Sequence, residues 1–148
     1  MDEETDIIST YNLAYIVNIE NSMNMDIDFH LPLSKMSELG FGKAFFLEYV
    51  YADDIDGEYR KGRAYRSHLK GVALKKIDNP DPSVLNQCKM IIKNKIYRSG
   101  GFVLYEIDSI DVYNRLIVTI YDPVTGECIN DILLRPEYSS VYQPYHLN

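Results

Sequence analysis

Alternation of apolar and polar residues dominates the first part of the chain. Residues 13–20 (LAYIVNIE) are rich in β-branched and aromatic side chains, and residues 24–31 (NMDIDFHL) place an apolar residue at every second position. Such alternation predicts strands, because successive side chains of a strand point to opposite faces. Asn21 and Ser22 separate the two runs, which predicts a β-hairpin that Pro32 ends.

A less regular stretch separates this hairpin from the next strand. Residues 43–52 (KAFFLEYVYA) have strand propensity, and residues 53–58 (DDIDGE) predict a turn. Residues 63–74 (RAYRSHLKGVAL) predict a further strand, in which Gly71 is a candidate bulge.

Helical spacing of apolar residues appears in residues 82–97. Pro82 stands at the first helical position, Asp81 before it is a candidate N-cap, and residues 99–101 (SGG) stop the helix. Five apolar side chains form one stripe, through which we expect the helix to pack: Val84, Leu85, Cys88, Ile91 and Ile92.

Two more strands and a short helix complete the pattern. Residues 102–108 (FVLYEID) and 115–122 (RLIVTIYD) predict strands, residues 127–134 (ECINDILL) predict a short helix, and the Tyr-rich tail, residues 136–148, has little periodicity. Five strands with a helix between the third and the fourth predict an OB-type five-stranded barrel, an α+β class that is mainly β. We expect one domain over residues 1–148.

Charge is distributed unevenly along the chain. The formal net charge of −7 argues against a general nucleic-acid binder. Residues 60–98, however, hold 11 of the 15 Lys and Arg and only two acids, Asp78 and Asp81, so this segment carries +9 and the remainder −16. We expect about half of its strand cations to share one outward face with Lys89 and Lys93, because strand side chains alternate.

Location and redox state are predicted from features at the N-terminus and from the cysteines. The acidic start, residues 1–10 (MDEETDIIST), has no basic region followed by an apolar one, and no apolar run is long enough for a membrane span. Two cysteines, Cys88 and Cys128, are too few for a disulfide framework and are interpreted as reduced, half-buried thiols. These features predict an intracellular protein, in the cytoplasm or the nucleus.

Residues 111–134 (DVYNRLIVTIYDPVTGECINDILL) resemble the staphylococcal, or thermonuclease-like, nuclease family. Asp111, Tyr113 and Arg115 keep the spacing of the family's D-K-Y-G-R motif, Tyr121 stands where the next strand ends in tyrosine, and residues 129–131 (IND) fit its V/I-N-E motif. Three other stretches resemble the family's first hairpin, its R-L-x-G-x-D-x-P-E strand, and the end of its first helix with the strand that follows: residues 15–29, 68–76 and 94–108.

The resemblance implies an OB-type barrel with an insertion at about residues 33–60, which should add a strand or hairpin at the barrel's edge. It also implies a catalytic centre that has lost its acids. The two metal-binding acids of the family correspond here to Ser22 and Ala73, its catalytic glutamate to Lys76 and its first arginine to His68; its second arginine is kept as Arg115. Lone nuclease-like domains of this kind resemble those of large DNA viruses.

These departures favour a non-catalytic binding module over an enzyme. Calcium needs several oxygen ligands, so we expect no metal and no cofactor. The expected partner is single-stranded DNA or RNA, or an acidic protein surface, with Tyr65 as a further candidate for stacking on bases. The candidate nucleic-acid-binding residues are Arg63, Arg66, Lys70, Lys76, Tyr113 and Arg115.

Alternatives remain open at three points. A divergent, calcium-dependent nuclease that hydrolyses phosphodiester bonds is the second hypothesis, and residues 56–58 (DGE) in an acidic loop offer a replacement for the lost metal ligands. His68 is a candidate base, although a hydrogen-bonded strand histidine is favoured. Arg115 fits a phosphate contact and an ion pair with Asp111 equally well.

Overall fold

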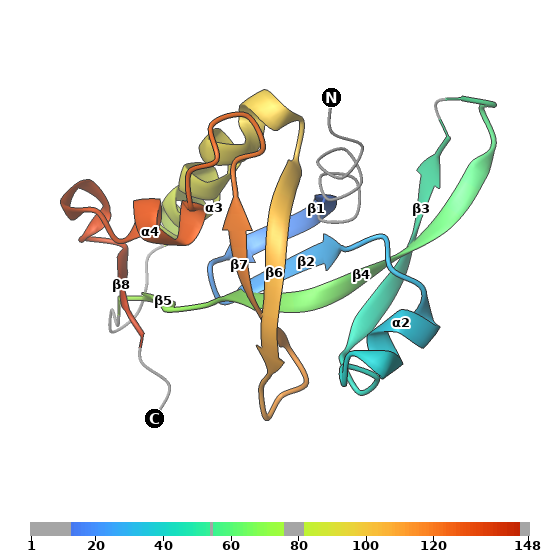
Figure 1. Ribbon diagram of the computed structural model, residues 1–148. Coiled ribbons are helices and arrows are strands. Elements are labelled where there is room, and N and C mark those ends of the chain that lie inside the picture. Colours follow the sequence, from blue (N-terminus) through green and yellow to red (C-terminus); the bar gives the residue numbers. More distant parts are fainter. Residues whose placement is uncertain (1–12, 54, 76–81, 146–148) are drawn as a thin grey trace, which may run out of the picture.

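The computed structural model describes residues 13–53, 55–75 and 82–145. Five strands close a barrel in the order β2-β1-β6-β7-β4, because β4 pairs with β7 on one side and with β2 on the other (Figure 1). The predicted OB-type barrel, α+β and mainly β, is confirmed. The elements are β1 (Leu13–Asn21), β2 (Asn24–Asp28), α2 (Leu33–Glu38), β3 (Phe46–Ala52), β4 (Tyr59–Leu69), β5 (Val72–Leu74), α3 (Pro82–Ile96), η1 (Tyr97–Ser99), β6 (Phe102–Ile110), β7 (Leu116–Tyr121), α4 (Ile129–Leu133), η2 (Pro136–Tyr138) and β8 (Tyr142–Pro144).

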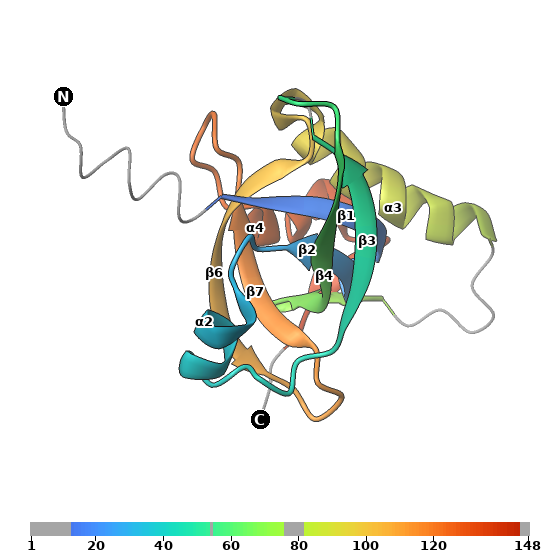
Figure 2. The same cartoon turned by 90° about the vertical axis from the view of Figure 1, so that its right-hand side faces the viewer.

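The stretch that precedes β4 adds a strand at the barrel's edge. Strand β3 pairs antiparallel with β4 along its whole length, from Phe46 opposite Tyr65 to Ala52 opposite Tyr59. The resulting hairpin projects beyond the barrel in Figure 1 and lies in front of it in Figure 2. The expected extra strand is therefore present, and the same stretch also forms the short helix α2.

Strand β4 differs from its sequence prediction at both ends. It begins at Tyr59 rather than at residue 63, and it ends at Leu69. Gly71 has a φ of 78° and lies in a turn between β4 and β5, so it is not a bulge within one strand. Only glycine adopts such a φ without steric cost, and the turn sends β5 out of the barrel to pair with β8.

Helix α3 packs on the barrel against β1. Cys88 and Ile92 are buried and Ile91 is partly buried, as the predicted stripe required, and Ile96 extends that stripe. Asp81 and the side chains of Val84 and Leu85 lie outside the described part of the chain. None of the helices within the described residues is long and apolar enough to cross a bilayer.

The tail of the chain contributes to the core, although its sequence shows little periodicity. Val141 and Tyr142 are buried, and the Tyr142 hydroxyl donates a 2.9 Å hydrogen bond to the carbonyl oxygen of Cys88 on α3. Helix α4 is anchored by Asn130, whose amide donates to the carbonyl oxygens of Lys70 and Val118 and whose oxygen accepts from the backbone N–H of Ile120. These hydrogen bonds hold α4 against β7 and against the end of β4.

Strand β2 is buried on both faces. Met25 and Ile27 point into the core as predicted, yet Asp26 and Asp28 between them are only 6% exposed. Each carboxylate finds its partner on the β3–β4 hairpin: Asp26 pairs with Arg66, and Asp28 accepts a hydrogen bond from Tyr49. Buried carboxylates need such partners, and a single-strand pattern does not reveal them.

Candidate nucleic-acid interface

The turn between β6 and β7 is organised by one carboxylate. Asp111 accepts the backbone N–H groups of Tyr113 and Arg115 through Oδ1, each at 2.9 Å, and the Arg115 Nε–H through Oδ2 at 2.8 Å. Asn114 adopts a φ of 62°, which asparagine tolerates better than most residues. The short Asp-Val-Tyr-Asn-Arg sequence therefore fixes both the turn and the direction of the arginine.

This turn is joined to β4 through Phe45. The backbone N–H of Phe45 donates to the Asn114 carbonyl at 2.9 Å, and its carbonyl accepts from the Arg66 N–H at 3.0 Å. Residues that are far apart in the sequence are thus held side by side by main-chain hydrogen bonds, which do not depend on side-chain rotamers.

An open hollow of about 390 Å³ forms where these segments meet. We call it the arginine hollow, and it is lined by Asn24, Phe45, Arg66, Tyr113 and Arg115. Phe45 and Tyr113 are 50% and 74% exposed, whereas the side chains of Arg66 and Arg115 are only 26% and 19% exposed. The Arg115 guanidinium lies 5.4 Å from the centre of the Tyr113 ring, a cation–π distance.

Both guanidinium groups are already paired with acids. Arg115 donates to Asp111 and, through Nη1, to the Met23 carbonyl at 3.1 Å. Burial tends to raise the pKa of Asp111, but the hydrogen bonds from Arg115 and the turn outweigh burial and lower it. Asp111 is therefore ionised at neutral pH and neutralises much of the charge of Arg115.

The Arg66 pair is looser than the Arg115 pair. Its Nε lies 2.9 Å from Asp26 Oδ1, yet neither atom makes an aligned hydrogen bond, and Nη1 lies 3.7 Å from Glu20. An ion pair without hydrogen-bond alignment is easier to redirect toward another anion.

A smaller hollow of about 240 Å³ lies on the other side of Arg115 and Tyr113 and contains His68 and Tyr145. His68 is buried, its Nε2 lies 3.2 Å from the Val72 carbonyl, and its ring packs 5.5 Å from that of Tyr145. A carbonyl can only accept, so Nε2 carries the proton. Burial, followed by the field of Arg115, lowers the pKa of His68 despite that bond. This geometry agrees with the interpretation that the sequence favoured, in which His68 is a hydrogen-bonded strand histidine.

The positions that the nuclease resemblance assigns to a catalytic centre lie close together where they are described. Ser22 and His68 both point at the Val72 carbonyl, and Ala73 follows directly in β5. Arg115 binds the carbonyl oxygen of Met23, next to Ser22. Lys76 lies outside the described residues.

The described part of the chain offers no cluster of metal ligands. Within residues 13–53, 55–75 and 82–145, no group of three or more His, Cys, Asp or Glu side chains is placed to hold a metal ion. In the acidic loop that was a candidate replacement, Asp53 and Asp56 instead bind Arg60.

Part of the basic segment is paired with acids from other parts of the chain. Among its described cations, Arg60, Lys61, Arg66 and Lys70 each form an ion pair with an Asp or Glu, and the segment continues through the lysines of α3. Lys70 lies 2.8 Å from Asp108, Arg60 binds the hairpin loop, and Arg63 donates to the Leu31 carbonyl at 3.3 Å. Folding thus balances part of the uneven charge of the sequence, and of the predicted binding residues that the structure describes, Arg66, Tyr113 and Arg115 meet in the arginine hollow.

Tyr65 was expected to stack on bases, and this prediction is wrong. The residue is 3% exposed and its ring packs between those of Phe29 and Phe46. Phe45 takes that place in the arginine hollow. Two adjacent phenylalanines in the sequence gave no sign of which one faces the solvent.

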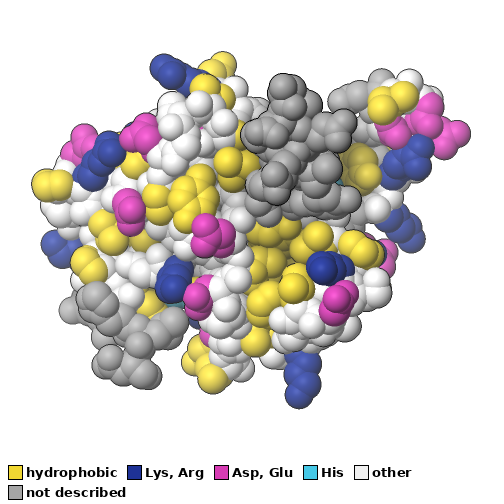
Figure 3. All heavy atoms as spheres, viewed as in Figure 1, with side chains coloured by type: hydrophobic (Ala, Val, Ile, Leu, Met, Phe, Trp, Pro, Cys, Tyr) yellow, Lys and Arg dark blue, Asp and Glu magenta, His cyan; other side chains and the backbone are white. Residues whose placement is uncertain are grey.

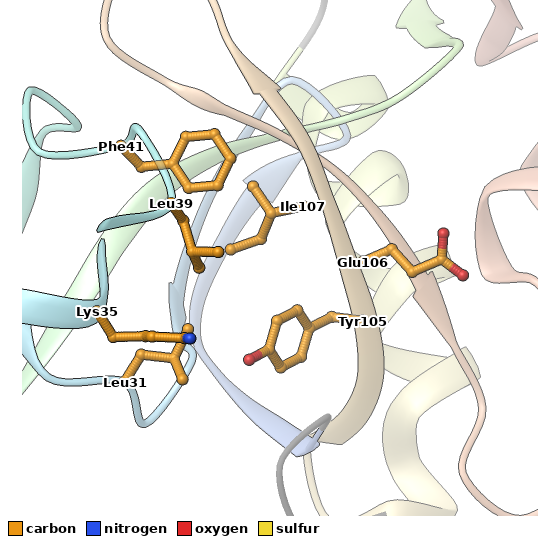
Figure 4. A pocket seen from close by; sticks show the side chains of 7 residues that line it. All are labelled: Leu31, Lys35, Leu39, Phe41, Tyr105, Glu106 and Ile107. Atoms are coloured by element: carbon orange, nitrogen blue, oxygen red, sulfur yellow. The ribbon is translucent and has the colours of Figure 1, made fainter. Parts of the chain in front are cut away.

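A further hollow, of about 710 Å³, lies between α2 and β6 and is mostly apolar (Figure 4). Leu39, Phe41 and Ile107 gather on one side of it, the Lys35 ammonium group approaches Tyr105, and Glu106 points away from the other side chains. It contains none of the predicted site residues.

Comparison of the chain with protein-family models and with curated proteins finds no match. What the molecule does must therefore be inferred from its own side chains.

Proposed function

We propose that the protein is a non-catalytic module that binds a short stretch of single-stranded nucleic acid in the arginine hollow. One observation carries the proposal: two exposed rings, Phe45 and Tyr113, stand beside two guanidinium groups, Arg66 and Arg115, in one open hollow of an OB-type barrel. Rings stack on bases of any sequence, and guanidinium groups bind phosphate oxygens in a bidentate manner.

The acids around the hollow set the expected strength. Asp26, Asp111 and Glu20 already face the two guanidinium groups, so a phosphate has to compete with carboxylates for them. We therefore expect weak binding that depends more on stacking than on charge. With two phosphates neutralised, the logarithm of the affinity should fall with the logarithm of the salt concentration with a slope of about 1.4.

The test is a fluorescence anisotropy titration with a labelled oligothymidylate of about eight nucleotides, inside the site size of one OB barrel. Tyr113→Ala should weaken binding about tenfold, because stacking contributes roughly 1–3 kcal/mol per base. Tyr97→Ala is the matched control: Tyr97 is 83% exposed on η1, outside the hollow, and its loss should leave the affinity unchanged. Absence of binding at low salt, or equal losses in the two variants, contradicts the proposal.

The remaining hypotheses are outcomes of the same experiment. Calcium-dependent shortening of the oligonucleotide that disappears in Arg115→Ala supports the divergent nuclease instead. Competition by an acidic peptide, with no oligonucleotide bound, supports an acidic protein partner. Membership of the thermonuclease-like family and a cytoplasmic or nuclear location stay predictions from the sequence, and fluorescence imaging of the tagged full chain in cells tests the location.

A further inference from the structure

A hollow of about 560 Å³ lies at the other end of β4, beside the projecting β3–β4 hairpin. We call it the aromatic cleft. Four rings line it together with His30 and Asp53: Tyr15, Tyr49, Tyr51 and Phe102. It shares no residue with the arginine hollow.

Strand geometry places the rings in two pairs. Tyr15 and Phe102 are direct partners in the β1–β6 ladder, and their ring centres are 5.1 Å apart. Tyr49 and Tyr51 are two residues apart on β3, so both point to one face, with ring centres 5.8 Å apart. The cleft is therefore bounded by one ring pair from the barrel and one from the hairpin.

Each pair includes a tyrosine that packs on a glycine. A Cβ atom at Gly62 would lie 2.7 Å from the Tyr49 ring and 2.7 Å from Asp28 Oδ2, and one at Gly101 would lie 3.1 Å from the Tyr15 ring. Gly101 also has a φ of 92°, which favours glycine. Both rings lie directly against main chain, which fixes the walls of the cleft.

Each oxygen of the two carboxylates near the rings already accepts a hydrogen bond. Asp28 accepts a hydrogen bond from the Tyr49 hydroxyl at 2.7 Å and one from the backbone N–H of His30 at 2.9 Å. Burial, and after it the hydrogen bond to Asp28, raise the pKa of Tyr49, so its hydroxyl stays protonated. Asp53 is bound by Arg60 at 2.5 Å and accepts the Ile55 N–H. The cleft thus offers negative potential and ring faces, but few free acceptors.

The hairpin that forms one wall is acidic. Residues 46–62 contain five acids and two cations, a formal charge of −3. Figure 3 shows Asp and Glu side chains gathered at its projecting tip. The field of the hairpin therefore favours a cation in the cleft.

We propose that the aromatic cleft binds the trimethylammonium group of a methylated lysine in a basic peptide. Ring faces attract a cation through their quadrupole, and aromatic sites of this kind recognise quaternary ammonium groups. A primary ammonium or a guanidinium loses hydrogen bonds to water on entry and needs acceptors in return, and it would have to share the oxygens of Asp28 and Asp53 with the donors that already bind each of them. A trimethylammonium group has no N–H to satisfy, so it fits this cleft best.

The experiment is a titration of the ¹⁵N-labelled full chain with three basic peptides followed by NMR. The peptides are identical except for one side chain: trimethyllysine, unmodified lysine, or the neutral tert-butyl analogue of trimethyllysine. We expect the trimethyllysine peptide to bind at least about fivefold more tightly than the other two and to shift the amides near Tyr15, Tyr49, Tyr51 and Phe102.

Variants distinguish the cleft from the rest of the acidic hairpin. Tyr51→Ala removes one ring and should weaken the trimethyllysine peptide roughly three- to thirtyfold. Tyr59→Ala removes a 79% exposed tyrosine on the same hairpin, outside the cleft, and should have no effect. Equal binding of the charged and neutral side chains, equal effects of the two variants, or no binding at all overturns the proposal. None of these results depends on whether the arginine hollow binds nucleic acid.

Discussion

The two ends of β4 carry surfaces that are built in opposite ways. The arginine hollow is held by charges and hydrogen bonds, and Asp111 organises the turn that carries Tyr113 and Arg115. The aromatic cleft is held by rings packed on Gly62 and Gly101. The first should respond to pH and salt, and the second to small changes of shape.

The difference also concerns charge. At the arginine hollow, cations are present but carry carboxylate partners; at the aromatic cleft, carboxylates are present but carry cation or hydroxyl partners. The molecule therefore presents aromatic surfaces whose neighbouring charge has opposite sign.

The largest expected effect is that of Gly62→Ala. The added Cβ would lie 2.7 Å from Tyr49, so the ring must move and the hairpin must open, which we expect to lower the free energy of unfolding by about 1–3 kcal/mol. Urea unfolding of Gly62→Ala measures this. Gly42→Ala is the control, because its Cβ would first meet the flexible Ser37 hydroxyl at 3.1 Å. A loss no greater than that of the control would show that packing on Gly62 does not hold the cleft.

Asp111→Asn should have a smaller effect that depends on pH. Asparagine keeps an oxygen for the turn but loses the charge that faces Arg115, which we expect to cost about 1 kcal/mol at pH 7. The pKa of Asp111 is lower in the folded than in the unfolded chain, so the unfolded chain takes up the proton first as the pH falls. The stability advantage of the wild type should be complete above about pH 4 and disappear below it. Urea unfolding at pH 7 and pH 3 tests this; a pH-independent difference contradicts it.

His68→Gln tests the neutral histidine beside the arginine hollow. Burial holds the pKa of His68 below its ordinary value of 6.5, so the unfolded chain binds the proton more readily. The wild type should therefore lose stability as the pH falls below about 6.5, while the glutamine variant, which can still donate to the Val72 carbonyl, should lose less. Thermal unfolding between pH 7.5 and pH 5 compares them, with the ranges chosen around the ordinary pKa of histidine. If the stability of the two proteins falls in parallel with pH, groups other than His68 cause the pH dependence.

The smallest effect is expected at Lys70, although the sequence gave it a binding role. Its pair with Asp108 is half-exposed, and such pairs contribute about 0–1 kcal/mol. Lys70→Ala should therefore change neither the free energy of unfolding by more than about 1 kcal/mol nor the affinity for the oligonucleotide. Anisotropy titrations of the variant and the wild type measure the affinity for the oligonucleotide, and a clear loss of binding would show that Lys70 is part of the interface.

The fold was predictable because periodicity and turn signals depend on local sequence. The first hairpin, the proline at the start of α3 and the strands on either side of residue 111 were predicted correctly, although β2 ends at Asp28 rather than at residue 31. The tail was not, because β8 pairs with β5 about 70 residues earlier, and a three-residue strand has no detectable period.

The candidate site was predictable only in part. Arg115 and Tyr113 are close in the sequence and share one turn, so a local motif was sufficient to group them. Phe45 joins them through main-chain hydrogen bonds with Asn114 and Arg66. Asp26 on β2 forms an ion pair with Arg66 on the neighbouring strand β4 and offsets its charge. Such pairings between distant strands have no signal in the local sequence, and for the same reason the acids that pair with Arg66 and Lys70 could not be predicted.

The most direct test of the account uses both ligands on one ¹⁵N-labelled sample. The oligothymidylate and the trimethyllysine peptide are titrated separately and then together, and amide shifts are mapped on the barrel. We predict that the first shifts residues around Phe45, Arg66 and Tyr113, that the second shifts residues around Tyr15, Tyr49 and Phe102, and that each binds unchanged in the presence of the other. Overlapping shifts, or displacement of one ligand by the other, would contradict two separate surfaces of opposite charge preference.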